Sequence, residues 1–260
     1  DAEDALPASY DEKNQVEHLC VTLKDNNSAL KLELHYYIYE DCDVITRSAK
    51  VINTEEDKIR LTKAQAACID FVHGEFDVIS FYGRHAMERN MQRTSVGHGA
   101  FVIGSRRGTS SHQYNPMMIL AEKETTEDAG TCYGMSFVYS GGFKAEVEKD
   151  QFGQTRIQMG LQEEQFSYPL KKGEEFVIPE VILTCSNQGL EKLSQNLQRC
   201  IRKNLCRGKY KEKVRPVLIN SWEACYFDFT GEDIYHLAEQ AKDLGIDMVV
   251  LDDGWFGSRN

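Results

Sequence analysis

Two short segments of the chain combine carboxylates with tryptophan, and each follows a run of apolar residues. The first is Asn220-Ser221-Trp222-Glu223, and the second is Asp252-Asp253-Gly254-Trp255. They contain the only two tryptophans among the 260 residues. Carboxylates accept hydrogen bonds from hydroxyl groups, and an aromatic ring covers an apolar C–H surface, so the combination suits a sugar ring. The pattern therefore predicts a carbohydrate-binding rim.

Asp252 and Asp253 are adjacent, which argues against a catalytic pair of acid and nucleophile. Retaining glycosidases hold two carboxyls about 5 Å apart on either side of one bond, and inverting enzymes hold them further apart. Neighbouring residues of a strand point to opposite faces, and two neighbours at a strand end cannot easily reach one carbon from opposite sides. We therefore predict that the pair binds hydroxyl groups. From pattern alone a structural alternative stays open, in which Asp252 caps the following turn and Trp255 packs into a core.

The residues around these segments predict one strand–helix–strand unit. Residues 217–220 and 246–251 are continuous apolar runs, typical of strands that are buried on both faces. Between them, Thr230-Gly-Glu-Asp233 resembles a capping box, and apolar residues then recur at helical spacing until Gly245. A strand, a helix and a strand in about 40 residues imply a parallel pair. Ligands bind at the carboxyl ends of such strands, where both tryptophan segments lie.

Residues 1–185 predict a different architecture, a large antiparallel β-sandwich. Leu30–Tyr39 alternates apolar and polar residues with period two, which is typical of a half-buried strand. Similar segments follow at short intervals, separated by polar turns and with no convincing long helix between them. We expect the further strands at residues 16–23, 43–52, 59–71, 76–82, 117–121, 134–139, 143–147, 155–159 and 175–184.

Residues 186–213 predict a basic linker helix. Leucines and isoleucine recur at helical spacing after Ser186 and Asn187, which are candidate caps, and Gly208 is a plausible stop. The cations of this region are Arg199, Arg202, Lys203, Arg207, Lys209, Lys211, Lys213 and Arg215. Aromatic residues do not alternate with these cations as they do in nucleic-acid interfaces. We therefore expect a solvated linker and no nucleic-acid partner.

Composition excludes several classes of protein. Hydrophobic residues make up 41% of the chain and charged residues 27%, which is usual for a globular protein. The net charge of −11 disfavours binding to phosphate backbones, and no apolar run of 18 or more residues could cross a membrane. A closed eight-stranded α/β barrel needs about 250 residues by itself. A chain of 260 residues therefore cannot hold such a barrel together with a sandwich.

The eight cysteines form no C-x-x-C pair, and no spacing of cysteine and histidine suits zinc. Their low density argues against a disulfide scaffold. We expect free thiols in a reducing compartment, which means a cytoplasmic protein, and no metal site.

Four segments of the chain resemble glycoside hydrolase family 36 α-galactosidases. RPVLINSWEACYFDF (residues 215–229) and LGIDMVVLDDGWFG (residues 244–257) closely resemble the start of that family's catalytic barrel. LELHYYIYEDCDVITRSAKVIN (residues 32–53) and FYGRHAMERN (residues 81–90) are similar to the β-supersandwich that precedes the barrel. The resemblance covers essentially the whole chain and is most specific at WEA and DDGWFG.

The resemblance implies both a fold and a function. The fold is mainly β: a supersandwich over residues 1–185, a linker helix over 186–213, and the first βαβ unit of an incomplete (β/α)8 barrel over 214–260. In the family, a tryptophan after the first barrel strand and two aspartates after the second line the galactose subsite, and these positions match Trp222, Asp252 and Asp253. The implied reaction is hydrolysis of terminal α-galactosyl residues of melibiose- or raffinose-type sugars with retention, by a homotetramer that needs no cofactor.

The sequence also departs from the family pattern. The family's nucleophile is an aspartate in a K-x-D-x-N motif, which is absent from this sequence, and its acid/base residue lies later still. We therefore expect no catalytic residue within this chain and no turnover by the 260-residue piece alone. The family's first sandwich strands are expected before Asp1. Two alternatives stay open: a galactosyltransferase of the raffinose-synthase kind, and a non-catalytic sugar-binding or oligomerisation module.

Overall fold

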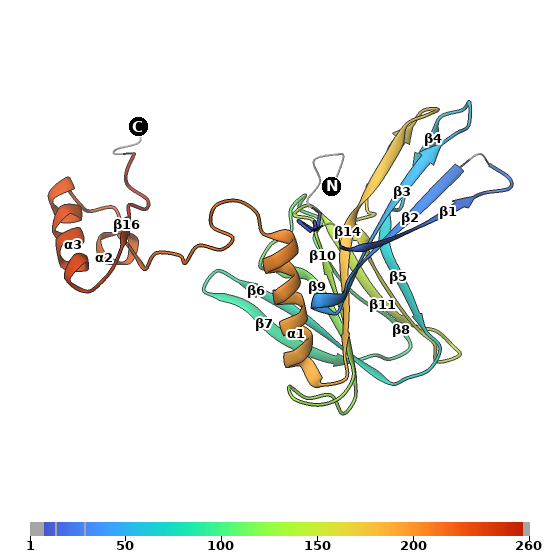
Figure 1. Ribbon diagram of the computed structural model, residues 1–260, viewed down its shortest axis with the longest axis horizontal. Coiled ribbons are helices and arrows are strands. Elements are labelled where there is room, and N and C mark those ends of the chain that lie inside the picture. Colours follow the sequence, from blue (N-terminus) through green and yellow to red (C-terminus); the bar gives the residue numbers. More distant parts are fainter. Residues whose placement is uncertain (1–7, 14, 29, 257–260) are drawn as a thin grey trace. The chain divides into compact units, whose positions relative to one another are not determined.

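The computed structural model describes residues 8–13, 15–28 and 30–256 (Figure 1). The chain divides into two compact units, Asp1–Cys206 and Arg207–Asn260. Strands dominate the first unit, and the described residues of the second form two short strands and two helices. No helix among the described residues is both long and apolar enough to cross a membrane.

The first unit is organised around one eight-stranded sheet in which every neighbouring pair is antiparallel. A second layer consists of the three-stranded sheet β11-β12-β5, the pair β13-β4, and β8 beside β11. In sheet order the large sheet contains β1 (Glu17–Lys24), β2 (Leu30–Tyr39), β3 (Val44–Asn53), β14 (Glu175–Ser186), β10 (Cys132–Phe137), β9 (Tyr114–Glu122), β6 (Phe76–Arg84) and β7 (Met87–Ser95). The second layer contains β4 (Ile59–Leu61), β5 (Gln65–Phe71), β8 (Gly99–Gly104), β11 (Phe143–Lys149), β12 (Thr155–Leu161) and β13 (Tyr168–Leu170). This confirms the prediction of a mainly β chain with large antiparallel sheets.

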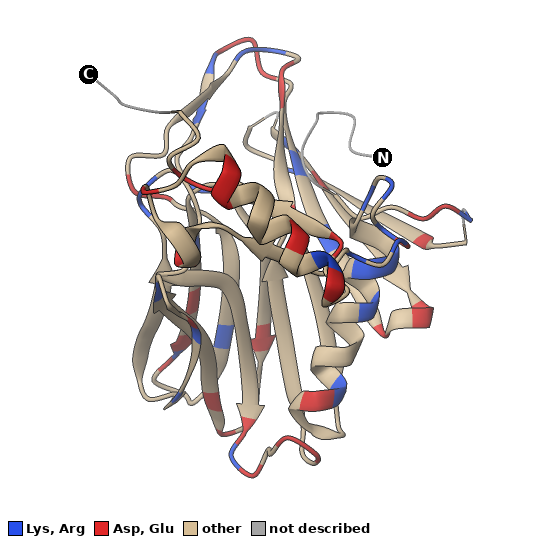
Figure 2. Cartoon of the chain, turned by 90° about the vertical axis from the view of Figure 1, so that its left-hand side faces the viewer, with Lys and Arg blue, Asp and Glu red and all other residues tan. Residues whose placement is uncertain are grey.

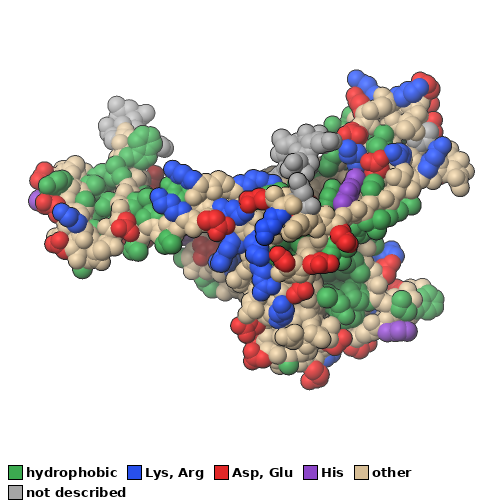
Figure 3. All heavy atoms as spheres, viewed as in Figure 1, with side chains coloured by type: hydrophobic (Ala, Val, Ile, Leu, Met, Phe, Trp, Pro, Cys, Tyr) green, Lys and Arg blue, Asp and Glu red, His purple; other side chains and the backbone are tan. Residues whose placement is uncertain are grey.

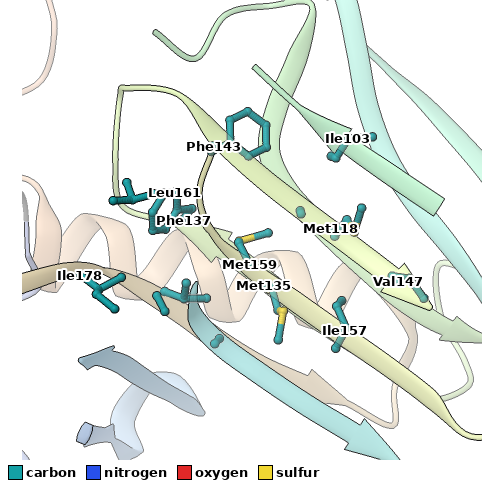
Figure 4. Close-up of a cluster of buried hydrophobic side chains, with 14 of the residues drawn as sticks. Ile103, Met118, Met135, Phe137, Phe143, Val147, Ile157, Met159, Leu161 and Ile178 are labelled. Carbon is teal, nitrogen blue, oxygen red and sulfur yellow. The ribbon is translucent and has the colours of Figure 1, made fainter. Parts of the chain in front are cut away.

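The main hydrophobic core lies between these two layers. Met118 and Met135 of the large sheet meet Val147, Ile157 and Met159 of the smaller one, and all five are at most 2% exposed (Figure 4). Side chains of a strand alternate between its two faces, so their neighbours along the chain point away from this core. The central strands of the large sheet are apolar at both sets of positions, and a second cluster is therefore buried on the opposite face.

Helix α1 (Gly189–Cys200) covers that opposite face (Figure 1). Its buried residues Leu193 and Leu197 belong to the cluster on this face, which also contains Ile79 of β6, Ile119 of β9 and Ile182 of β14. The helix is thus part of the first unit, and the prediction that it is a solvated linker is wrong. Helical spacing reveals an apolar face but not the surface that covers it. The lysines and arginines of this region lie along α1 and on the segment after it (Figure 2).

The predicted ends of this helix are also wrong in detail. Gln188 is the N-cap and makes no side-chain capping bond, whereas Ser186 only accepts from the Gln188 N–H. The first free amides of α1 are instead satisfied by carbonyls of the β9–β10 loop, because Leu190 N–H donates to Thr126 at 3.1 Å. At the other end a π-helical turn, η2 (Ile201–Leu205), leads into an extended residue before Gly208.

The segment before β1 is fixed to the large sheet by a buried acid. Glu180 is 5% exposed, and its carboxylate accepts from the Ser9 N–H at 3.0 Å and from the Ser9 hydroxyl at 2.8 Å. Tyr39 donates its own hydroxyl to the Ser9 oxygen. A short 3-10 turn, η1 (Glu40–Cys42), follows Tyr39. Burial raises the pKa of the Glu180 carboxyl.

Three strands of the first unit, β7, β8 and β13, were not predicted from the sequence. Strand β7 has the sequence MERNMQRTS and lies at the edge of the large sheet, where most of its side chains are exposed. An edge strand with polar residues on both faces has no hydrophobic period to detect. The segment 59–71 also differs from its prediction as one strand, because residues 62–64 separate β4 from β5.

The second unit is a parallel strand–helix–strand, as predicted. Strands β15 (Leu218–Asn220) and β16 (Met248–Val250) pair in parallel and flank α2 (Trp222–Cys225) and α3 (Gly231–Asp243). Thr230 and Asp233 form a reciprocal capping box, and Gly245 ends α3 with a φ of +75°. The strands are not buried on both faces, since Leu218 is 52% exposed within the described residues. Apolar side chains accordingly gather on the surface of this unit (Figure 3).

Candidate carbohydrate-binding site

The two predicted segments leave the sheet of the second unit side by side. Asn220 is paired with Val250 in the parallel register, and each is the last residue of its strand. The register continues for one residue, because the Ser221 N–H donates to the Val250 carbonyl at 3.0 Å. Asp252 therefore begins its loop next to the turn that leads into Trp222. The carboxyl ends of parallel strands are where α/β folds bind ligands.

A hydrogen-bonded network joins the first segment to the second. The Asn220 side-chain amide donates to Asp252 Oδ2 at 2.6 Å, and its oxygen accepts from the Trp222 N–H at 2.8 Å. The Ser221 hydroxyl accepts from the Asp252 N–H at 3.1 Å, and Ser221 is fully buried. The sequence pattern includes Asn220 and Ser221 in the first tryptophan segment but assigns them no contact or function. Their contacts depend on the register of β15 with β16, which no local pattern reveals.

Within the part of the chain that the structure describes, Asp252 keeps acceptor positions that these contacts do not occupy. Its Oδ1 accepts from the Asp253 N–H at 2.8 Å and its Oδ2 accepts from Asn220. A carboxylate has about four lone-pair sites, and contacts among the described residues occupy two of them. Asp252 thus accepts from the first residue of the following turn, and this bond is compatible with further bonds from hydroxyl groups. Asp252 is half-buried and Asp253 is exposed.

The two tryptophans have different surroundings. Trp222 is half-buried and makes edge-on contacts with Tyr226 and Phe227, with ring centroids 5.2 and 4.8 Å apart. Tyr226 adopts a φ of +50° and a ψ of −123°, an uncommon backbone for a residue with a side chain. Within the described residues Trp255 is 70% exposed and contacts the ring of Phe256.

The first unit contains an apolar cavity of about 590 Å³. Its lining residues include Ile38, Tyr133 and Met135, and only Glu40 and Asp43 among them are charged. Asp43 is already paired with Lys192 Nζ at 3.0 Å. A sugar needs several converging polar groups, and this lining does not supply them. Among the described residues no group of three or more histidines, cysteines or acids could hold a metal ion.

Comparisons with known proteins assign both parts of the chain. The glycosyl hydrolase family 36 N-terminal domain matches residues 1–171, and the family described as Melibiase matches residues 175–260. The chain is 60% identical over 255 residues to the bifunctional alpha-galactosidase/sucrose kinase AgaSK of Mediterraneibacter gnavus. This alignment covers 98% of this chain and 27% of that protein.

Solved structures agree with this assignment. The chain matches the GH36 alpha-galactosidase AgaA from Geobacillus stearothermophilus with a TM-score of 0.95 and 43% identity, over 98% of this chain and 36% of that one. A variant of AgaA in complex with raffinose matches with a TM-score of 0.94 and 42% identity, over 98% and 36% of the two chains. The chain thus spans about a third of the length of the solved relatives, and somewhat less of AgaSK.

Proposed function

Because the chain belongs to glycosyl hydrolase family 36, we propose that it is the part of an α-galactosidase that begins the galactose subsite. The observation that carries this proposal is the linked pair of Trp222 and Asp252 at the ends of two parallel strands. Among the described residues, two partners leave Asp252 with acceptor positions for sugar hydroxyls, and Asp253 offers a second, exposed carboxylate beside it. The ring of Trp222 covers the apolar face of the sugar.

We propose that the parent enzyme removes terminal α-linked galactose with retention. In that mechanism a carboxylate attacks the anomeric carbon while a second carboxyl group protonates the glycosidic oxygen, so the glycosidic bond breaks, the rest of the substrate leaves as an alcohol and a covalent galactosyl-enzyme forms. The second group then takes a proton from water, which displaces the first carboxylate and releases galactose with its original α configuration. The roles of nucleophile and acid/base fall to residues outside this sequence, which has no K-x-D-x-N motif. The 260-residue chain by itself should therefore bind galactose weakly and turn over no substrate.

The second unit is, in this proposal, the start of a catalytic (β/α)8 barrel. Its support is the parallel strand–helix–strand together with exposed apolar side chains such as Val217, Leu218 and Met248. Further strands and helices of a barrel would cover such side chains. The remaining proposals are a homotetrameric parent enzyme and a cytoplasmic location, the latter supported by eight cysteines that are free thiols.

The test measures hydrolysis by the parent protein. Purified parent enzyme is expected to release galactose from raffinose, melibiose and an aryl α-galactoside, and the first anomer seen by proton NMR is α-galactose. Asp252→Asn should lower kcat/KM by about 10- to 100-fold, because a hydrogen bond to a charged group is worth about 1.5–3 kcal/mol. Asp243→Asn is the matched control, since it removes an exposed carboxylate of α3 in the same unit.

Three results would contradict the proposal. The first is a parent protein that does not cleave α-galactosides, and the second is β-galactose as the first product. The third is equal activity of the Asp252→Asn and Asp243→Asn variants. Turnover of an aryl α-galactoside by the purified 260-residue chain would overturn the assignment of the catalytic residues to other segments.

A further inference from the structure

We propose that Asn220 is a positioning residue that holds Asp252 and Trp222 in one fixed arrangement for galactose. The inference rests on the proposed function, because it concerns the same sugar subsite. Asn220 does not need to touch the sugar for this role. Its amide joins the two segments that are predicted to touch it, with contacts of 2.6 Å to Asp252 and 2.8 Å to the backbone of Trp222.

The orientation of the Asn220 amide follows from its partners. The Trp222 N–H is a donor, so the atom that faces it must be the side-chain oxygen. The NH₂ group then has to face Asp252, whose carboxylate only accepts. Both contacts are therefore satisfied by one orientation of one amide, and the flipped orientation would break both.

Asn220 and Ser221 hold different parts of Asp252. The Ser221 hydroxyl fixes the backbone N–H of Asp252, and the Asn220 amide fixes its carboxylate. A charge-assisted bond at 2.6 Å orients the carboxylate more strongly than a bond between neutral groups. Asn220 thereby determines which Asp252 lone pairs remain open to a sugar. Because the same amide fixes the first residue of α2, it also sets the distance between Asp252 and the Trp222 backbone.

An aspartate at position 220 would keep the shape of the side chain and change its chemistry. One oxygen could still accept from the Trp222 N–H, but the other would face Asp252 without a proton. Two carboxylates at this distance repel, and one of them then titrates above its ordinary pKa. On protonation, the new acid regains a donor toward Asp252 Oδ2. Asp253 is the other titratable group next to this pair.

The experiment compares Asn220→Asp, Asn220→Ala and Gln240→Glu in the full-length parent enzyme. Gln240→Glu makes the same amide-to-acid change at an exposed position of α3. For each enzyme kcat and KM for an aryl α-galactoside are measured across pH 4 to 8, with circular dichroism as a check of folding. Each kcat/KM is divided by the wild-type value at the same pH, which removes the titration of the catalytic groups.

At pH 7 we expect Asn220→Asp and Asn220→Ala to lose about 10- to 100-fold in kcat/KM, as a misplaced binding group does. Below about pH 5 the deficit of Asn220→Asp shrinks at least threefold, because protonation restores its donor. The deficit of Asn220→Ala stays constant with pH, and Gln240→Glu matches the wild type throughout.

The outcomes separate this inference from the proposed function. If the wild-type parent cleaves no α-galactoside, the proposed function fails and the inference fails with it. If the wild type is active but Asn220→Asp is equal to it at pH 7, only the inference is overturned. A deficit of Asn220→Asp that is the same at every pH also overturns the inference. So does a deficit that comes with a loss of the circular dichroism signal that acid does not restore. Both are the behaviour of a residue that is needed only for folding.

Discussion

The contact of α1 with the large sheet predicts a large loss of stability in the variant Leu193→Ala. Leu193 is 1% exposed, and a methyl group added at Gly134 of β10 would lie only 3.1 Å from it, so the side chain rests directly on the sheet. The substitution removes three carbon atoms, each worth about 0.8 kcal/mol of burial. The cavity that remains adds to this cost, and the expected loss is about 3 kcal/mol in the free energy of unfolding.

Urea unfolding followed by far-ultraviolet circular dichroism measures this loss, because the first unit contains most of the strands. With a slope of about 2 kcal/mol per molar urea, the midpoint should fall by about 1.5 M while the slope stays unchanged. Ser194→Ala is the control, since the next residue along α1 is exposed and its loss should stay within about 0.5 kcal/mol. Equal midpoints for the two variants would refute the reasoning, because α1 would then be a linker that contributes nothing to the sandwich.

Three further predictions concern other contacts. Because burial raises the pKa of Glu180, the folded chain keeps a proton that the unfolded chain releases, so stability falls as pH rises above the ordinary value of 4.5. In the Glu180→Gln variant the urea midpoint should decrease less between pH 4 and pH 8 than it does in the wild type. An equal decrease in both proteins would contradict this prediction. Gly189→Ala should cost at least 1 kcal/mol more than Gly173→Ala in urea unfolding, because both glycines have positive φ but only a Cβ at Gly189 would meet backbone, at 2.3 Å from the Glu127 oxygen. Thr230→Ala should weaken the cap of α3 by about 1 kcal/mol, seen as faster hydrogen exchange of its first amides, and unchanged exchange would count against the capping box.

The architecture of the first unit could be predicted where its strands carry a hydrophobic period. Leu30–Tyr39 was found because Leu32 and Leu34 pack into the main core while the residues between them are polar. The same reasoning failed at its end, where Tyr39 faces the other side of the sheet and is buried beneath α1. Alternation of apolar and polar residues shows which side chains share a face of the strand, but it does not show whether both faces are buried. The second face is buried by α1, which comes about 150 residues later in the chain.

The geometry of the candidate sugar site could be predicted in outline because its residues lie at points that the local fold dictates. Apolar runs predict the two strands, and parallel pairing brings Trp222 and Asp252 to the same edge. The contact that joins them could not be predicted, since an asparagine at a strand end has many available partners. Only the register that pairs Asn220 with Val250, two residues before Asp252, selects this one. A shift of one residue in that register would separate the amide from the carboxylate and point Asn220 to the other face. The arrangement of the candidate site therefore depends on the pairing of two three-residue strands, and the Asn220 side chain joins the segments that follow them.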